Sequence, residues 1–558
     1  MLSFRLLLLS AVVLLVAARS GGKARLDRIK VNPDTGHFLD TEGRVRVFHG
    51  LNAVFKEPPF YPPFARNGTG TCEANPRYTM CPEEISQLYN DWGFNVIRLG
   101  VLWNAVQPAE GEIDHAYLST MKDLIEQLAA HGIYTIVDAH QDAMGSLFCG
   151  EGVPNWVVSK ALALAKWNSS DPRTASQSFP YPFKFNISID KSTGYPNHTD
   201  CMHNNFFAYY FTVESSAAWQ SLYNEPELWA YFGQSWAAVA AALSSVDKVL
   251  AYELINEPPP GDLYKFWKDP LHPARFLSDE KNLAAMYNAA HEHIRRQDND
   301  TIVMFESVVL DTYFGLLPLR SESDFVTSPG GPAYTDRAAY SYHLYCTNDA
   351  QGRPSKMPFC KDLLQNVWKG IQPTIKRLKT GAFLTEMGAS GIDADSRELL
   401  QAVLDQADDG LQSWAYWTYK DFHDITTQNA ATETLYNEDG SLQIPKLKTL
   451  SRTYAPAIAG QEIKMNFDPS SATFTLDYVY GSEFSGAVAV VAPTSIFLNE
   501  DLYYPNGFNV TVRPAAPSTS WRQVSKNYIE VHHDGLTSGG EHQISIVVTA
   551  LEYNILQR

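Results

Sequence analysis

Two glutamates in this chain have the residue type and the spacing for paired carboxyl chemistry. Glu257 lies in the sequence LINEP and Glu386 in FLTEMG, and each follows a short apolar segment. Glycoside hydrolysis needs two carboxyl groups, one to protonate the leaving oxygen and one to attack the anomeric carbon or activate a water. A single glutamate after a strand is about as often a surface ion-pair partner or a helix cap. Two of them, after different strands, favour glycoside hydrolysis.

Polar and aromatic side chains at the ends of the other apolar segments are the next functional candidates. They are Lys56, Arg98, His140, Asp142, Asn256, His343, Tyr345 and Trp417. The positive charge of Arg98 would keep Glu386 ionised. Asn256 would donate a hydrogen bond to the sugar hydroxyl beside the reacting carbon. The ring of Trp417 offers a platform on which the apolar face of a sugar stacks.

Several similar patterns are better explained by structure than by catalysis. Glu225 repeats the tripeptide of Glu257, but an Ala-rich helical stretch follows it, so we expect a surface residue of a helical region. Glu253 is expected to be a satisfied polar group inside the fold. The sequence 291–293 (HEH) lacks the HExxH spacing of a zinc site, and 532–534 (HHD) reads as a solvated loop. We therefore expect no metal and no cofactor.

Eight short apolar, β-branched segments recur before residue 420, with helical stretches between several of them. The segments are 45–51, 95–101, 134–139, 250–255, 301–305, 339–343, 383–385 and 413–418. The helical stretches are 82–92, 116–131, 281–296 and 362–378, the last interrupted by Pro373. Continuous apolar strands that alternate with helices predict a parallel sheet, and eight such units predict a (β/α)8 TIM barrel. In such barrels the carboxyl ends of the strands carry the active site.

The segments outside this pattern predict a long loop and a second domain. Residues 142–217 carry two cysteines and three glycosylation sequons, which favours a disulfide-tied loop over the active face. After about residue 455 the segments 472–478, 487–491, 508–513, 527–532 and 542–550 alternate or are β-branched, which predicts an antiparallel β-sandwich. We expect a signal peptide at 1–20, a catalytic barrel at 21–455 and the β-sandwich at 456–558.

The composition and the first residues indicate an exported globular protein. The chain has 558 residues, of which 45% are hydrophobic, and a formal net charge of −18. This acid excess argues against nucleic-acid partners and against charge-driven docking on anionic membranes. The apolar run 6–18 followed by Ala-Arg-Ser is typical of a secretory signal, and it is too short for a membrane anchor. We expect a secreted monomer, outside the cell or in a lysosomal or digestive lumen, with no stable membrane insertion.

Cysteines and sequons agree with export. The six cysteines allow 15 connectivities, and short loops favour Cys72–Cys81 and Cys346–Cys360, which leaves Cys149–Cys201. Asparagines in N-x-S/T sequons are the expected glycosylation sites. They are Asn67, Asn168, Asn186, Asn197, Asn299 and Asn509.

These motifs together resemble glycoside hydrolase family 5. NVIRL at 95–99, LINEP at 254–258, FLTEMG at 383–388 and the strand of Trp417 are similar to that family. DAHQD at 138–142, Lys56 and YHLY at 342–345 resemble its endoglycoceramidase branch. The resemblance implies that Glu257 is the acid/base and Glu386 the nucleophile of a retaining reaction. It also implies sugar binding by Lys56, His140, Asp142, Asn256, Tyr345 and Trp417, with Arg98 and His343 supporting the nucleophile.

The resemblance implies a glycosphingolipid substrate, cut between its oligosaccharide and its ceramide. Two alternatives stay open at this point. One is a family 5 enzyme that acts on another β-glucoside or on a simple glycolipid. The other is a non-catalytic carbohydrate-binding protein, which the loss of either glutamate would have favoured.

Overall fold

The fold was established from a computed structural model of the chain. It describes residues 27–66, 72–165, 185–192, 194–204, 206–262, 279–309, 322–346, 353–354, 356–422, 426–427, 430–481, 490, 492–536 and 540–552. The expected signal peptide and the sequons at Asn67 and Asn168 lie outside these residues. So does most of the expected strand at 487–491.

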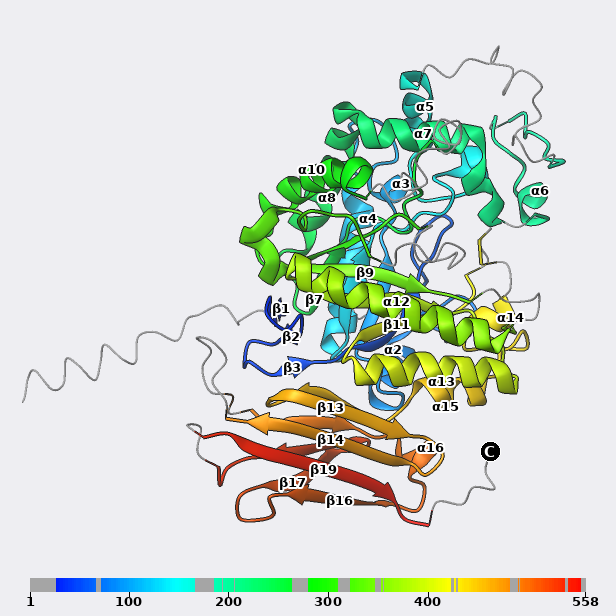
Figure 1. The fold of residues 1–558 in the computed structure, drawn as a ribbon. Coiled ribbons are helices and arrows are strands. Elements are labelled where there is room, and N and C mark those ends of the chain that lie inside the picture. Colours follow the sequence, from blue (N-terminus) through cyan, green and yellow to red (C-terminus); the bar gives the residue numbers. More distant parts are fainter. Residues whose placement is uncertain are drawn as a thin grey trace, which may run out of the picture.

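Eight parallel strands close into a barrel at the centre of the larger part of the molecule (Figure 1). In barrel order they are β4 (His49–Ala53), β5 (Val96–Gly100), β6 (Tyr134–Asp138), β7 (Val249–Glu253), β8 (Ile302–Glu306), β9 (Ala338–Leu344), β10 (Gly381–Gly388) and β11 (Ser413–Trp417). Every residue of these strands is buried except Gly388, which is half-buried. Continuous burial explains why the strands read as unbroken apolar runs in the sequence.

Helices lie around the barrel, and the longer ones bury an apolar face. They are α2 (Pro82–Asn90), α3 (Trp103–Val106), α4 (His115–Ala130), α5 (Asn155–Leu164), α6 (His198–Met202), α7 (Val213–Asn224), α8 (Pro226–Leu243), α10 (Ala284–Arg295), α12 (Met357–Leu378), α13 (Ala394–Asp409), α14 (Ala430–Glu433) and α15 (Ile444–Leu450). Shorter turns are η2 (Ser146–Phe148), η3 (Phe206–Phe211), η5 (Asp279–Leu283) and η6 (Gly331–Arg337). The predicted TIM barrel is confirmed. None of the described helices is long and apolar enough to cross a membrane.

Three local expectations need correction. The first barrel strand begins at His49, because Val45 and Arg46 form a separate strand, β3. Pro373 does not end its helix but lies inside α12. His533, expected in a solvated loop, is 5% exposed and stacks on Tyr480 at a ring-centroid distance of 4.2 Å.

The C-terminal part consists of two antiparallel sheets. One is a seven-stranded sheet in the order β1 (Lys30–Val31), β2 (Phe38–Leu39), β3 (Val45–Arg46), β12 (Tyr454–Ile458), β15 (Thr494–Phe497), β18 (Tyr528–His532) and β17 (Ser520–Ser525). The other has the order β13 (Gln461–Asp468), β14 (Thr473–Tyr480), β19 (His542–Ala550) and β16 (Phe508–Arg513), and a short helix α16 (Glu500–Tyr503) follows β15. Side chains of both sheets share one hydrophobic core, which gives the predicted sandwich.

The N-terminal strands β1–β3 connect the two parts of the molecule. β3 pairs with β12 of the C-terminal sheet, with Val45 opposite Ile458. Phe38 of β2 packs edge-on against Phe48 and contacts Phe383 of the barrel. The strands β1–β3 therefore cover the amino-terminal end of the barrel and also extend the seven-stranded sheet.

Three disulfides tie the described loops, with the pairing that the loop lengths favoured. They join Cys72–Cys81, Cys149–Cys201 and Cys346–Cys360. The second closes part of the long segment between β6 and β7, which carries α5, α6 and η3 rather than plain loop. Residues 149–152 lie directly on the end of β6. A Cβ on Gly150 would stand 1.9 Å from the main-chain oxygen of Asp142, so only glycine fits there.

Candidate active site

The two predicted catalytic glutamates meet at the carboxyl ends of the barrel strands. Glu257 follows β7, and Glu386 lies near the end of β10. A bulge in the pairing of β9 and β10 brings Glu386 level with His343. One carboxylate oxygen of Glu257 and one of Glu386 lie within 4.8 Å of each other. Both side chains are almost fully buried, at 3% and 4% exposure.

Arg98 of β5 holds the anionic side of this site. Its Nη1 lies 2.5 Å from Oε1 of Glu386, and its Nη2 donates to Asn256 Oδ1 at 2.8 Å. Although burial opposes the charged guanidinium, the carboxylates of Asp138, Glu253 and Glu386 raise the pKa of Arg98 above its usual range. Tyr345 donates a second hydrogen bond to Glu386, at 2.8 Å. Arg98 and Tyr345 thus contact the two different oxygens of the Glu386 carboxyl group.

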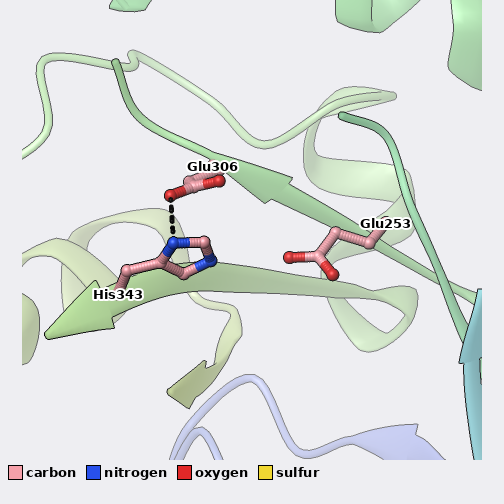
Figure 2. A group of neighbouring side chains, drawn as sticks. All are labelled: Glu253, Glu306 and His343. Carbon is pink, nitrogen blue, oxygen red and sulfur yellow. Dashed lines mark ion pairs between the residues drawn. The ribbon is translucent and has the colours of Figure 1, made fainter. Parts of the chain in front are cut away.

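His343 lies between the two glutamates rather than beside the nucleophile alone. Its Nδ1 makes a 2.7 Å hydrogen bond with Oε1 of Glu257 and lies 3.5 Å from Oε2 of Glu386. Burial lowers the pKa of His343 to about 4, so the imidazole is neutral at physiological pH. Figure 2 shows the ring close to the carboxyl groups of Glu253 and Glu306, two residues that end neighbouring strands.

A second group of predicted site residues lies at the ends of other strands, and we call it the sugar floor after its predicted role. The rings of His140 and Trp417 are nearly parallel, with centroids 5.3 Å apart, and Lys56 Nζ lies 4.7 Å from the centre of the Trp417 ring. Lys56 donates to Asp142 at 2.6 Å. Trp417 is oriented by the hydrogen bond from its Nε1 to Glu433, at 2.9 Å. These predicted sugar-binding residues therefore lie together, although they come from three different strands.

His140 carries a positive charge in this floor. Its Nδ1 lies 2.7 Å from Asp138 and its Nε2 lies 3.3 Å from Asp142. Burial opposes the charged ring, but the neighbouring Asp138 carboxylate raises the pKa of His140 to about 9. Burial also opposes ionisation of Asp142, yet Lys56 and His140 hold its pKa well below the usual value. The floor is thus an array of paired charges.

Asn256 has one amide hydrogen committed to the protein. Its Nδ2 donates to the main-chain oxygen of Gln141 at 3.0 Å, and its Oδ1 accepts from Arg98. The amide plane is therefore fixed from both sides. Its second amide hydrogen is the one that the predicted bond to a sugar hydroxyl would use.

Some site residues did not come out of the sequence reasoning. Glu306 ends β8 and accepts the main-chain N–H of Glu257 at 2.8 Å. The strand-end rule that found Glu257 would have found Glu306 as well. Thr426, which contacts both Lys56 and Asp142, and Glu151, which lies 3.4 Å from Lys56 Nζ, come from loops with no recognisable motif. Glu225 and Glu253 occupy the helix boundary and the buried barrel position that were expected.

Among the described residues, two groups of carboxylates with an imidazole are close enough to share a cation. They are Glu253–Glu306–His343 and Glu257–His343–Glu386, with ligand atoms within 4.8 Å of one another. Arg98, however, contacts Glu253 and Glu386, and its fixed positive charge would repel a metal ion. A reaction without metal therefore stays our prediction.

Comparison with known families assigns both parts of the chain. Residues 62–423 match the model of "Cellulase (glycosyl hydrolase family 5)". Residues 452–548 match the model of the "Glycoside hydrolase family 5 C-terminal domain".

Individual relatives extend over nearly the whole chain. An endoglycoceramidase of Cyanea nozakii is 33% identical over 524 residues, which cover 93% of each chain. Endoglycoceramidase I of Rhodococcus hoagii is 27% identical and covers 86% of this chain and 81% of its own. Among solved structures, a ganglioside GM3 complex of endo-glycoceramidase II from Rhodococcus sp. superposes with a TM-score of 0.67 at 20% identity, over 92% of this chain and 99% of that one. This last likeness supports a shared fold.

Proposed function

Because the chain belongs to glycoside hydrolase family 5, we propose that it is a retaining endoglycosidase that releases the intact oligosaccharide from the ceramide of glycosphingolipids. The observation that carries the reaction type is the short distance between the glutamates. Retaining glycosidases have carboxyl groups about 5–5.5 Å apart, whereas inverting enzymes need about 6.5–9.5 Å to admit a water. One carboxylate oxygen of each glutamate lies within 4.8 Å of the other, which fits the shorter separation of retaining enzymes.

The two steps follow from the environments of the glutamates. Glu386 attacks the anomeric carbon, the bond to the ceramide oxygen breaks, and Glu257 gives its proton to that oxygen. A water then gives a proton to Glu257 and attacks the same carbon, which releases the sugar and restores Glu386. Arg98 contacts and positions Glu386, and His343 orients Glu257 for both proton transfers.

The glycosphingolipid substrate is supported by the relatives. The proteins named endoglycoceramidase align over 86–93% of this chain. Those named glucosylceramidase align over only 24–43% of it. Hydrolysis of another β-glucoside or a simple glycolipid is therefore the second candidate. The paired catalytic glutamates argue against a protein that only binds carbohydrate.

A product assay tests this substrate. The purified enzyme is incubated with ganglioside GM3, with glucosylceramide and with a cellulose oligosaccharide, and the products are identified by mass spectrometry. We expect free ceramide together with the complete GM3 oligosaccharide. Cleavage of glucosylceramide or the cellulose oligosaccharide without cleavage of GM3 would instead support the second candidate.

We also propose that the protein is exported, glycosylated and monomeric. Three disulfides in the described residues support an oxidising compartment. Asn186, Asn299 and Asn509 are exposed, and Asn197 is partly buried at the start of α6. Glycan mapping and amino-terminal sequencing of the secreted protein, with its mass measured by light scattering, test these three points.

A further inference from the structure

The main chain of Glu257 has a conformation that its residue type disfavours. Its φ is +41°, in the left-handed region where a side chain with a Cβ costs about 1–3 kcal/mol. Such a conformation persists only when neighbouring groups hold it. The preceding Leu254 and Ile255 are buried in the hydrophobic core. The chain must turn after them for the side chain of Glu257 to face the site.

Two side chains hold the peptide groups of Glu257, one from the end of each strand that neighbours β7. Glu306, at the end of β8, accepts the N–H of Glu257 at its Oε2, at 2.8 Å. Gln141, after β6, donates its Nε2 to the main-chain oxygen of Glu257 at 3.1 Å and to that of Asn256 at 2.7 Å. The turn that carries the acid/base is therefore fixed by both neighbouring strand ends.

Glu306 is itself held in place and has no access to solvent. It is 2% exposed, and Tyr287 donates to its main-chain oxygen at 2.9 Å. Its Oε1 lies 3.6 Å from Nδ1 of His343, the ring that bonds the carboxyl group of Glu257 (Figure 2). Glu306 thus contacts the acid/base at its main chain and faces the imidazole that orients its side chain.

We propose that Glu306 is the positioning residue of the acid/base, because it holds the main chain of Glu257 in the turn that directs its carboxyl group toward His343 and the nucleophile. This inference rests on the function proposed above. It assigns Glu306 no contact with substrate.

The charge of Glu306 decides which substitution can replace it. Burial, together with the carboxylates of Glu257 and Glu253, raises the pKa of Glu306 well above its usual range. This shift favours the neutral acid, and the oxygen that accepts the N–H of Glu257 is the functional part of Glu306. A glutamine has the same shape and an acceptor oxygen, and it carries no charge. Methionine has a similar size but no such acceptor.

The test compares Glu306→Met and Glu306→Gln on two substrates that share a sugar and differ in their leaving group. Lactosylceramide needs a proton on its leaving oxygen, whereas 2,4-dinitrophenyl β-lactoside does not need one in its first step. General acid catalysis contributes about 10²–10⁴-fold, and a displacement of about 1 Å can forfeit 10²-fold. For Glu306→Met we expect kcat/KM on lactosylceramide to fall by about 10–100-fold. The rate of the dinitrophenol burst should stay within about threefold of the wild-type rate.

Controls separate positioning from general damage. Glu306→Gln should restore most of the loss and keep the wild-type pH profile. Gln141→Met, which removes the other side of the clamp, should repeat the pattern of Glu306→Met. Glu225→Met, in the second Asn-Glu-Pro at the boundary of α7 and α8, should behave as wild type.

Three results would overturn the inference. One is an equal loss on both substrates, which would indicate a structural role only. Another is a Glu306→Gln variant as defective as Glu306→Met. The third is full activity of Glu306→Met on lactosylceramide. If Glu306→Met does not fold, Glu306→Gln and Gln141→Met still decide the question. Failure of the proposed function is distinct, since the wild-type enzyme itself would then not release ceramide.

Discussion

Two residues of the same type acquire different roles from their surroundings. Glu386 faces the permanent positive charge of Arg98 and the hydroxyl of Tyr345. Glu257 faces a neutral imidazole, and its main chain contacts another carboxyl group, that of Glu306. The two glutamates thus have different neighbours, which fits the different roles proposed for them in a retaining reaction.

Azide should distinguish the two glutamates. Glu257→Ala should still form the glycosyl-enzyme from an activated aryl glycoside and then stall, because no base remains to activate water. Azide needs no deprotonation, so it should rescue turnover and give the β-glycosyl azide. Glu386→Ala should form no intermediate, and azide should give only the α product. Product stereochemistry measured by NMR checks both, and the reverse assignment would exchange the two roles.

His140 should make a pH-dependent contribution to stability. Its pKa in the folded protein is about 9, above the unfolded value of 6.5. Its stabilisation is therefore complete below pH 6.5 and is lost as the pH rises through about 9. Compared with His140→Gln, the wild type should be more stable by about 3 kcal/mol at pH 5.5, with the difference gone near pH 10.

Denaturant unfolding at several pH values measures this difference. The control is His115→Gln at an exposed position, which should change stability by no more than about 0.5 kcal/mol. If the stability difference between the wild type and His140→Gln grew with pH, Asp138 and Asp142 would not retain the proton on the ring.

Residue types after apolar strands predict much of this site, but not its loop-borne parts. Glu257, Glu386, Arg98 and His343 are found this way because parallel strands end at the same edge of the barrel. Glu306 follows the same rule but stands outside the recognised motifs. Thr426 reaches the site from a loop and Glu433 from the four-residue helix α14, where local sequence does not determine position.

At the scale of elements, the disulfide-tied segment after β6 completes the sugar floor. Cys149 and Cys201 are joined, and the segment between Asp142 and Glu151 closes on itself through two main-chain hydrogen bonds. This closure places Glu151 near Lys56, and Tyr210 donates to Asp142 at 3.1 Å. The loop therefore supplies groups to the site instead of only covering it.

Removal of this disulfide should weaken substrate binding as well as stability. Cys149→Ser with Cys201→Ser frees a loop with a sequence separation of 52, worth up to about 4 kcal/mol by loop-closure entropy. We expect KM to rise by about tenfold, the effect of losing one hydrogen bond to a charged group, with a smaller change in kcat.

The matched control removes the disulfide Cys72–Cys81, at the start of α2. That variant should lose about 2–3 kcal/mol of stability with KM unchanged. Equal KM values for the two double variants would show that the sugar floor does not depend on the long segment.

Sequence periodicity located the barrel strands but not their partners outside the barrel. The apolar run at 45–51 contains two elements, and only its second half enters the barrel. The short strands β1 and β2 have two residues each, too few to show a period. β13 alternates between buried and exposed positions over eight residues, a period-2 pattern that does indicate a strand but lies outside the segments expected above.

At the scale of the whole molecule, barrel and sandwich share both a sheet and a buried ion pair. Arg452, 1% exposed, lies 2.8 Å from Asp408 of α13 and donates to the main-chain oxygen of Phe467 in β13. Figure 1 shows α13 and α15 lying between the barrel and β13. His49 of the first barrel strand stacks on Tyr454 of β12. These contacts predict that the two parts unfold together.

Arg452→Met tests this coupling, because it leaves Asp408 buried without its cation. Breaking one side of a buried ion pair costs about 3–5 kcal/mol. Burial already raises the pKa of Asp408 to about 7, and loss of Arg452 should raise it further. A carboxyl group whose pKa is higher in the folded than in the unfolded protein lowers the stability as the pH rises. The stability lost through Arg452→Met should therefore be small at pH 5 and largest at pH 8 and above. Arg522→Met, at an exposed pair with Glu530, should cost no more than about 1 kcal/mol.

Scanning calorimetry gives the decisive readout for this coupling. With a continuous sheet and a shared ion pair, Arg452→Met should move a single endotherm to lower temperature without splitting it. Inactivation, which reports the barrel alone, should then move by the same number of degrees. The contrary result would be two endotherms, with inactivation following the one that does not move. The sandwich would then melt independently, and the pairing of β3 with β12 would not couple the two parts.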